Sequence, residues 1–464
     1  MSIGRLFDIS ARTMQAYQSA MDVASNNISN AGNANFTRQK VVFASEVGEK
    51  GAGNGVKIQD ILRVRSEILD QQIRKYQSGY SDANKRSETL QKIESIISEP
   101  SDQGLSNYVV QFYNSWDELS TNPTSLQLRS NVILKAQQVG EKIKNTIDGF
   151  SEVQYSLQQE ATQTVNEINL HLKSIYEMNQ QIYDTESRGV KANELKDQRD
   201  TEIDELSKLV NISVSKSSSG ALSINVGGIF AVDQTNYNEF SVKMINGQLS
   251  LVNKADQNSQ AILTGGELNA ISDLYSNKVT SYKEKYEEWA KSFVTEVNNL
   301  HMQGYALSSS GVSTNGIPFF GQLDSSGQVI NAFEDDELRI NSDLLNDPSL
   351  LAISSAPNKD GDSTFANQIA NLSKSKIASL GNQTFAENYS GILSVIGSDK
   401  TVADNSSQSN ELVLQNLENQ RSSNSGVSLD EEMTNVMKYQ RSYEASAKMI
   451  KVADDLMQTI LNLI

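Results

Sequence analysis

The sequence contains no cysteine, only five prolines and only two histidines, so several chemistries and several kinds of fold have little support. Without cysteine, disulfide bonds and thiolate chemistry are excluded. The scarcity of proline favours long, uninterrupted helices, because proline breaks a helix in its interior. No Gly-x-Ser-x-Gly, Walker, dinucleotide-binding or His-Glu-x-x-His pattern occurs. We therefore expect no enzyme, no cofactor and no metal site.

Basic residues are also scarce relative to acidic ones. Lys and Arg total 40 against 57 Asp and Glu, which gives a net charge of −17. Nucleic acids and anionic membrane surfaces both require a basic footprint on a protein, so neither is an expected partner. No apolar run approaches the length of a membrane span. The sequence enters an amphipathic pattern directly after Met1, without the apolar core of a secretory signal.

What the chain does have is an apolar seven-residue repeat near each end. Such a spacing keeps one stripe of a helix facing a neighbouring helix. We expect these two stripes to form an assembly interface, with the last residue packed against other molecules. The stripes consist of Phe7, Met14, Met21 and Ile28, and of Leu429, Val436, Tyr443, Ile450, Met457 and Ile464.

The same repeat predicts long helices in the interior of the chain. One lies within residues 60–98, one or two more within 125–208, and another within 267–302. Their apolar rows are Leu62, Leu69, Tyr76, Ala83, Leu90 and Ile97, then Ile147, Ala161, Ile168, Ile175 and Ile182, and finally Val279, Tyr286, Phe293 and Leu300.

From Ile212 the pattern changes to alternation of apolar and polar residues, which is typical of strands. Turn signals at Gly227-Gly228 and Asn246-Gly247 separate the alternating segments, and Asn-Gly strongly favours a hairpin. The expected fold is mainly α with a smaller all-β domain. It is an elongated rod of long coiled-coil-like helices from both chain halves, with an antiparallel β domain inserted in the middle and both termini at one end.

Four regions are expected from these patterns. Residues 1–42 and 426–464 form a terminal helical domain for axial assembly. Residues 43–209, 267–302 and 361–425 form a long-helix bundle, and residues 210–266 form the β domain. Residues 303–360 are an irregular loop or a vestigial outer region.

Several polar features have plain structural interpretations. His171 falls in a packing row, and His301 lies near a helix end where it can bond the last carbonyls. Asp335-Asp336-Glu337 reads as a solvated acidic loop. The stretch 358–363 faintly suggests a calcium loop but lacks the downstream Glu, so a turn followed by an N-cap at Ser363 is favoured. Ser428 and Glu431 have the spacing of a capping box.

The residues near both ends resemble the signatures of bacterial flagellar axial proteins, and in particular the FlgK family of hook–filament junction proteins. A further match is Leu195-Lys196-Asp197-Gln198-Arg199-Asp200. The N-terminal motif comprises Asn26, Asn27 and Ile28, followed by Phe36, Thr37, Arg38 and Gln39. The C-terminal match runs from Gly426 to Glu432 and on through Tyr439 to Ala447.

This resemblance implies a structural subunit of the flagellum, with no catalytic role, at the junction between hook and filament. It implies export through the flagellar type III apparatus without a cleaved signal peptide, and an extracellular location. The implied partners are the hook protein, a second junction protein or the filament, copies of the chain in a ring, and an export chaperone on the C-terminal helix. Well-studied relatives carry a further outer domain, which we expect to be absent or vestigial here.

Three alternatives remain at this stage. A flagellar rod or hook subunit shares the Asn-Asn-Ile element but has a largely β middle, whereas this chain has long helices. A peptidoglycan hydrolase carried on the axial structure needs a paired carboxylate site in a cleft, and no stretch supplies one. A coiled-coil receptor or adhesin needs a membrane segment that the sequence lacks.

Overall fold

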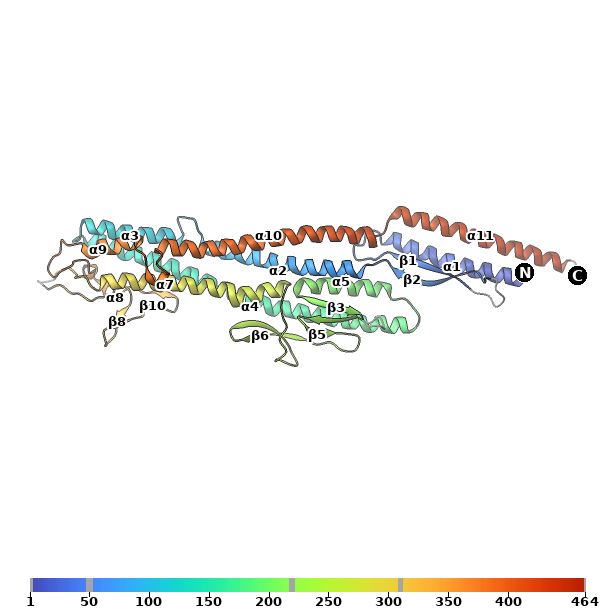
Figure 1. Ribbon diagram of the computed structural model, residues 1–464, viewed down its shortest axis with the longest axis horizontal. Helices are drawn as coiled ribbons and strands as arrows, with labels where there is room; N and C mark the ends of the chain where they lie inside the picture. The colour runs from blue at the N-terminus through green and yellow to red at the C-terminus, as the bar shows by residue number, and fades with distance from the viewer. Residues whose placement is uncertain (1–2, 47–52, 217–221, 308–311, 463–464) are drawn as a thin grey trace.

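The chain forms a long rod with both termini at the same end (Figure 1). The computed structural model describes residues 3–46, 53–216, 222–307 and 312–462. Helices from both halves of the chain run along the rod, and the antiparallel strands of the middle segment lie on its side. The expected fold class is confirmed.

The helices and strands of the described residues have the following bounds. The α-helices are α1 (Ile3–Ser29), α2 (Glu67–Ile97), α3 (Leu105–Thr121), α4 (Leu126–Ser187), α5 (Asn193–Leu209), α6 (Glu267–Asp273), α7 (Thr280–His301), α8 (Ser342–Asn346), α9 (Thr364–Asn371), α10 (Phe385–Ser425) and α11 (Leu429–Leu461). The strands are β1 (Gln39–Ser45), β2 (Val56–Arg63), β3 (Ile212–Lys216), β4 (Leu222–Val226), β5 (Ile229–Val232), β6 (Phe240–Ile245), β7 (Gln248–Asn253), β8 (Gln322–Leu323), β9 (Val329–Ile330), β10 (Phe333–Glu334) and β11 (Glu337–Leu338).

The spine of the rod is α4, a helix of 62 residues. At 1.5 Å per residue it is about 90 Å long. Ser125 caps its start by accepting a hydrogen bond from the backbone N–H of Leu128. The apolar row that predicted this helix is buried along its whole length, from Ile147 to Ile182. Each such side chain contributes roughly 1.5–3 kcal/mol, so the row accounts for much of the cohesion of the bundle.

The structure corrects the expected course of residues 43–66. Leu62 was taken as the first member of a helical row, but it lies in β2 and is 50% exposed, and α2 begins only at Glu67. Strand β2 pairs with β1 in an antiparallel hairpin that lies along α1. Residues 43–46 and 53–63 therefore lie beside the terminal helices, and the expected boundary at residue 42 falls inside β1.

The middle strands form two small antiparallel sheets, β3-β4-β5 and β6-β7. The Asn246-Gly247 turn joins β6 to β7 with positive φ at both residues, which is the backbone that this dipeptide favours. The Gly227-Gly228 turn between β4 and β5 has the same property. Asn169 on α4 bonds both the N–H and the C=O of Phe240, so β6 is fixed to the spine of the rod.

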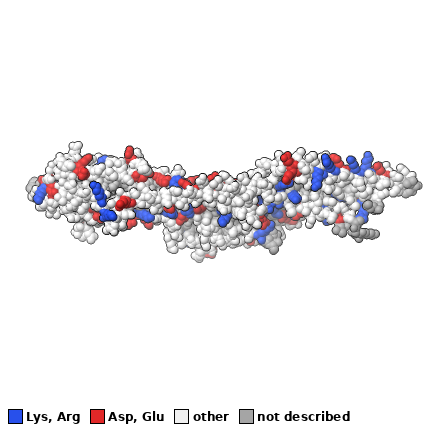
Figure 2. Space-filling model, turned by 45° about the horizontal axis from the view of Figure 1, so that its top comes forward, with Lys and Arg blue, Asp and Glu red and all other residues white. Residues whose placement is uncertain are grey.

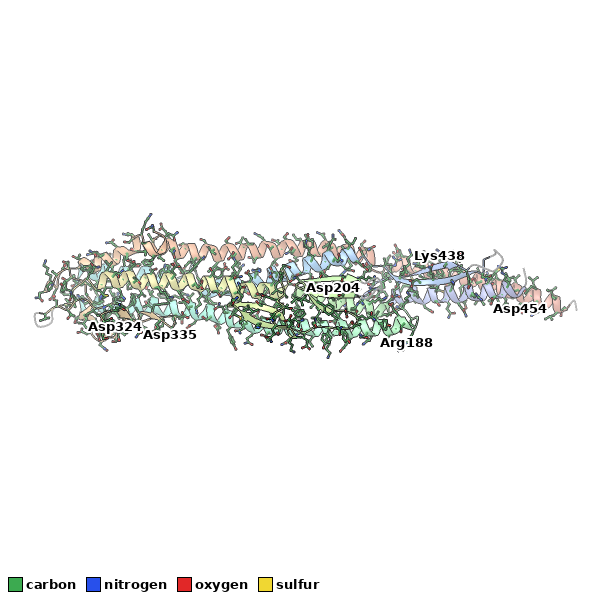
Figure 3. The ribbon with its side chains drawn as sticks, turned by 60° about the horizontal axis from the view of Figure 1, so that its bottom comes forward. Arg188, Asp204, Asp324, Asp335, Lys438 and Asp454 are labelled. Carbon is green, nitrogen blue, oxygen red and sulfur yellow. The ribbon has the colours of Figure 1, made fainter. Side chains whose placement is uncertain are left out.

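The end of the rod farthest from the termini is capped by residues 303–360, most of which form short strands, turns and single helical turns. Asp324 and Asp335 lie at this end, opposite Lys438 and Asp454 (Figure 3). The segment is irregular, as expected, but it has a packed interior. Phe319 and Phe320 are fully buried against aromatic side chains of the bundle, including Phe112 and Phe293.

His301 holds this cap to the bundle, and its partners differ from those expected. It does not bond the last carbonyls of α7. Its Nδ1 lies 2.7 Å from the carbonyl oxygen of Ile317, and its Nε2 accepts a hydrogen bond of 3.0 Å from the N–H of Ala352. The imidazole is fully buried. An imidazole that donates from Nδ1 and accepts at Nε2 is the neutral form.

We predict a pH dependence of stability that depends on His301. Burial, together with the nearby Arg129 guanidinium, lowers its pKa to about 4, although the Ile317 carbonyl opposes this shift. Because the unfolded chain has an ordinary histidine pKa of about 6.5, it binds the proton first as the pH falls. The stability that this histidine contributes is complete above pH ~6.5 and falls by about 3 kcal/mol as the pH drops toward 4.

The measurement is urea unfolding of the wild type and of His301→Gln at pH 7.0 and pH 4.5. At pH 7.0 the variant should be less stable by about 1–3 kcal/mol, because a buried ring and its hydrogen bonds are lost. At pH 4.5 the difference should shrink. A difference of equal size at both pH values contradicts the prediction.

Candidate assembly site at the terminal helices

Helices α1 and α11 run antiparallel to one another at the end of the rod that carries both termini (Figure 1). Where they meet, the buried side chains are small. Apart from Asn27 and Glu432 at one end, they are Ser10, Ala16, Ala20 and Ala24 on α1, and Ser446 and Ala453 on α11. Small side chains let two backbones approach closely, and the larger apolar side chains then lie beside the seam.

The predicted heptad rows lie beside this seam and are incompletely covered. Phe7, Leu429 and Met457 are 46%, 52% and 45% exposed. The other described members are half-buried, and Ile464 lies outside the described residues. The single chain thus leaves much of the apolar surface of its terminal helices uncovered.

The β1–β2 hairpin is fixed to both terminal helices by three aromatic rings. The Phe43 ring lies 5.4 Å from that of Tyr17 on α1 and 5.9 Å from that of Tyr439 on α11, measured between centroids. The two tyrosine rings are 6.2 Å apart. Aromatic pairs at such distances contribute about 0.5–1.5 kcal/mol beyond the area that they bury.

Asn27, from the N-terminal motif, joins the beginning and the end of the chain. It is fully buried, and its side-chain amide bonds both the C=O and the N–H of Gln39 at 2.8 and 3.0 Å. The same amide nitrogen donates to the Glu432 carboxylate at 3.1 Å. A buried amide needs its partners, so this position requires a side chain that both donates and accepts.

Arg38 completes this contact between the two terminal motifs. Its Nε donates to Glu432 at 2.9 Å, and its Nη1 lies 2.7 Å from the Glu431 carboxylate. The Ser428 side chain caps α11, as expected, by accepting from the N–H of Glu431. The expected capping box is incomplete, because the Glu431 carboxylate pairs with Arg38 and no bond back to the Ser428 N–H is formed.

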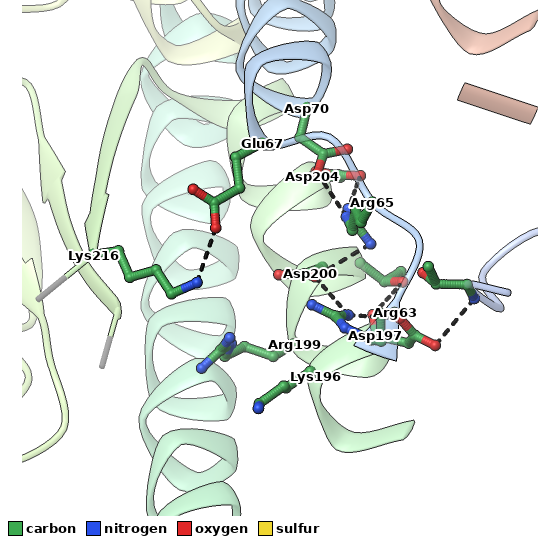
Figure 4. Close-up of polar contacts among 12 residues, drawn as sticks. Arg63, Arg65, Glu67, Asp70, Lys196, Asp197, Arg199, Asp200, Asp204 and Lys216 are labelled. Carbon is green, nitrogen blue, oxygen red and sulfur yellow. Dashed lines mark hydrogen bonds and ion pairs between the residues drawn. The ribbon is translucent and has the colours of Figure 1, made fainter. Parts of the chain in front are cut away.

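The third sequence motif lies on α5, at the joint between the terminal helices and the bundle. Asp197 accepts a hydrogen bond of 3.1 Å from the N–H of Thr37 and pairs with Arg63 of β2 at 2.6 Å. Asp200 pairs with Arg63 at 2.9 Å and with Arg65 at 3.2 Å. The close-up in Figure 4 shows these carboxylates and guanidinium groups gathered on one side of α5.

Asp204 connects the same cluster to α2 and to the end of α10. It pairs with Arg74 of α2 at 2.7 Å and with Arg421 of α10 at 2.9 Å. Figure 3 places Asp204 between the bundle and the terminal helices. We call Asp197, Asp200, Asp204 and their arginine partners Arg63, Arg65, Arg74 and Arg421 the arginine–aspartate cluster. It joins three segments: the connection from α1 to β1, the connection from β2 to α2, and the end of α10.

The electrostatics of the cluster favour the charged forms on both sides. Burial alone would raise the pKa of Asp200, but Arg65 and Arg63 lower it below its ordinary value. Burial alone would lower the pKa of Arg65, yet Asp200, Asp70 and Asp204 raise it. Asp200 and Arg65 are therefore held ionised by their partners.

The sequence analysis identified part of this site. The motif on α5 was noticed, but the partners Arg63, Arg65, Arg74 and Arg421 were not. A signal for them existed. Asp197, Asp200 and Asp204 follow one another at intervals of three and four residues, which places them on one face of a helix. A buried acidic stripe of this kind requires cations from elsewhere in the chain.

The other polar residues singled out in the sequence make ordinary structural contacts. His171 pairs with Glu202 at 2.7 Å on the side of the bundle. Asp335 is 85% exposed and shares Arg339 with Glu337, while the Asp336 carboxylate reaches Lys283. Helix α9 begins after Ser363, but the first N–H of the helix, that of Thr364, donates to Asp362, and the serine side chain makes no capping bond.

The described residues contain neither a candidate metal site nor a candidate membrane-spanning helix. No group of three or more His, Asp or Glu side chains is arranged to hold a metal ion. None of the described helices combines the length and apolar character that crossing a bilayer requires. On the face drawn in Figure 2, Lys and Arg side chains are interspersed with Asp and Glu along the molecule.

Comparison with known proteins places these features in a family. A family model described as the flagellar hook-associated protein FlgK helical domain matches residues 90–320. Flagellar hook-associated protein 1 of Bacillus subtilis is 27% identical over 97% of this chain and 96% of its own length. The Salmonella typhimurium protein of the same name is 24% identical over 97% of this chain and 98% of its own.

The chain belongs to the FlgK family. This is a family of structural flagellar proteins. A second model, of the C-terminal part of flagellar basal body rod proteins, matches residues 418–463, which cover α11. Among solved structures, the flagellar hook junction protein FlgK from Burkholderia pseudomallei aligns with a TM-score of 0.63, over 76% of this chain and all of that one. At 14% identity, that likeness establishes the fold alone.

In this FlgK-family chain, we predict that Glu432 is needed for the terminal helices to stay folded on the rod. Glu432→Ala leaves the Asn27 amide without one acceptor and removes a buried partner of Arg38. The free energy of unfolding of this region should fall by about 2–3 kcal/mol, because the groups left behind stay buried without their charged partner. The measurement is hydrogen exchange, in which amides of α1 and α11 should lose protection while those of α4 keep it.

Glu431→Ala is the matched control. Glu431 also pairs with Arg38, but its side chain is 61% exposed. Exposed pairs contribute about 0–1 kcal/mol, so this variant should exchange nearly as the wild type does. Equal loss of protection in the two variants would show that burial of Glu432 is not what matters.

Proposed function

We propose that this chain is a structural subunit of the bacterial flagellum that forms the junction between hook and filament. Its terminal helices α1 and α11 make the contacts that hold it in the axial structure, and the bundle and the β sheets lie away from those contacts. Membership of the FlgK family supports this assignment, as does the rod with both termini at one end.

The observation that carries the proposal is the uncovered apolar face of α11. Soluble proteins rarely expose so many large apolar side chains on one element unless another molecule covers them. Nine of them on this helix are at least 44% exposed: Leu429, Met433, Met437, Met449, Val452, Leu456, Met457, Ile460 and Leu461. A helical stripe of this kind fits other helices, and copies of this chain in a ring supply them.

The finer assignments follow from the same surface. The hook protein is the partner on one side of the ring, and a second junction protein or the filament is the partner on the other. Before assembly the same face of α11 needs cover, and an export chaperone is a fitting occupant. The chain acts outside the cell, after export through the flagellar type III apparatus. Its role is mechanical, and no step of catalysis is assigned to it.

A rod or hook subunit is the second candidate, because the C-terminal segment matches the rod-protein family model. That match covers α11, and in this proposal all axial proteins of the flagellum have such a terminal helix. The helical-domain match at residues 90–320 covers the part of the chain that differs, and it favours the junction.

We predict that replacing Val436 and Ile450 together with Asp blocks assembly and leaves a folded monomer. Both side chains are half-buried at the edge of the α1–α11 seam in the single chain. Burial of such a side chain by a neighbour contributes roughly 1.5–3 kcal/mol, and an unpaired charge placed there costs more. The measurement is complementation of a deletion strain, scored by filaments and motility.

The matched control is Val395→Asp with Val402→Asp on α10. These valines are 41% and 61% exposed, and the control makes the same chemical change on a helix away from the termini. It should restore filaments. Normal assembly of the α11 variant, or failure of both variants, would mean that the interface has been placed wrongly.

The experiment that tests the function itself is deletion of the gene in its host, followed by negative-stain microscopy of cells and spent medium. Hooks that lack filaments, with flagellin lost to the medium, are the expected result. Intact filaments would reject the assignment. Cells without hooks would favour the rod or hook alternative.

A further inference from the structure

A pocket beside the arginine–aspartate cluster is lined by more cations than carboxylates, although the whole chain has a net charge of −17. It lies between the end of β2, the start of α2, helix α5 and strand β3, and has a volume of about 440 Å³. Seven Lys or Arg side chains line it, against four Asp or Glu side chains. Three more carboxylates, those of Asp60, Asp197 and Asp204, pair with these cations from just outside the lining.

Most of these cations already have a carboxylate partner. Arg63 and Arg65 are held by the cluster, and Lys216 pairs with Glu67 at 2.9 Å. Lys191 pairs with Asp60 at 2.9 Å, and Lys196 pairs with Glu186. These partners neutralise most of the cations, but the single partner of Lys196, Glu186, has a side chain that is 35% exposed. Partly exposed pairs contribute little, so Lys196 can also turn to an anion.

Arg199 is different. Its side chain is only 6% exposed, yet it has no ion pair within 4.0 Å among the described residues. Its one hydrogen bond runs from Nη1 to the side-chain oxygen of Asn179, at 2.9 Å. Its Nε is buried with no acceptor. Figure 4 shows Arg199 and Lys196 extending from α5 next to one another, on the side that faces Lys216.

The environment of Arg199 is costly for a charge. Burial lowers its pKa to about 10; Asp200 opposes that shift, and the positive Arg63 adds to it. Buried charges in proteins are ordinarily paired and fully hydrogen-bonded. A guanidinium with an unused buried donor, in a pocket of like charges, lacks the acceptor that its chemistry requires.

Arg129, by comparison, is a buried arginine of this chain whose Nε and Nη1 both have hydrogen-bond acceptors. It is fully buried and, among the described residues, also has no carboxylate within 4.0 Å. Its Nε donates to the Pro123 carbonyl at 2.9 Å, and its Nη1 donates to the Leu351 carbonyl at 2.6 Å. Backbone oxygens complete that site, whereas the Arg199 site has one amide oxygen and an open pocket.

We propose that this pocket is a binding site for a small oxyanion of the phosphate or carboxylate class, with Arg199 as its main ligand and Lys196 as a second. A guanidinium matches two oxygens of such an anion with two parallel hydrogen bonds. The anion would supply the acceptor that Arg199 lacks, at the place where α5, β2 and β3 meet. Its binding would therefore stiffen the joint, independently of the assignment to the flagellum.

The test uses the full chain and two probes, inorganic phosphate and citrate, at constant ionic strength and pH 7. Isothermal titration calorimetry should show saturable binding of at least one probe to the wild type. Arg199→Gln should weaken that binding at least tenfold, and Lys196→Gln should weaken it several-fold. Thermal unfolding should show a saturable rise in midpoint with the anion, since a ligand of the native state stabilises it.

Arg188→Gln is the control, because Arg188 is an exposed arginine at the end of α4 that does not line the pocket. It should bind the anion as the wild type does. Phosphate also stabilises proteins through exclusion from their surface, and that general effect is equal in all variants and does not saturate. Absence of saturable binding to the wild type would overturn the proposal. So would unchanged binding in both Arg199→Gln and Lys196→Gln, and the Lys196 variant keeps the test decisive if the Arg199 variant does not fold.

Discussion

Three aspartates on one face of α5 hold together the segments that meet at the joint of this molecule. Asp197 reaches the backbone before β1, Asp200 reaches the connection from β2 to α2, and Asp204 reaches the end of α10. These segments lie as much as 384 residues apart, from Thr37 to Arg421. The orientation of the terminal helices on the rod depends on this one helix face, because the chain passes from rod to terminal helices nowhere else.

An ionic joint has different properties from an apolar one. Buried ion pairs add little net stability, because removing the charges from water offsets most of their attraction. They do impose direction, since a guanidinium binds a carboxylate in few geometries. The stability of the rod comes from the apolar rows of α4 and its neighbours, and the direction of the terminal helices comes from the arginine–aspartate cluster. The two tasks are divided between two kinds of interaction.

The same division is seen in the terminal helices. Their contact with each other is a narrow seam of Ala and Ser, fixed at one end by Asn27, Arg38 and Glu432. That seam uses little of the apolar surface that the two helices carry. Larger side chains are thereby left on the outside, where only another molecule covers them. A subunit that must be joined to neighbours through its ends is well served by this arrangement.

Periodicity alone predicted the long helices, the β segment and the turns between strands. The row on α4 is buried as expected, because packing against a neighbour removes a long apolar stripe from water. In the row that leads into α7, Val279, Tyr286 and Phe293 are buried and Leu300 is half-buried. The pattern misled at Leu62, where the seven-residue spacing continued by chance into a strand. It also gave no indication that His301 would bond a loop 51 residues away, at Ala352.

What the amino-acid order determined, then, is the set of elements, their lengths and their apolar faces, since these follow from local spacing and from burial. Which polar groups meet was decided by the tertiary structure. Arg63, Arg65, Arg74 and Arg421 find Asp197, Asp200 and Asp204 only after the helices have packed. The spacing of the three aspartates marks one face of α5, but nothing in the sequence indicates which arginines will meet that face. The direction of the terminal helices and the cationic pocket at Arg199 both arise at that step.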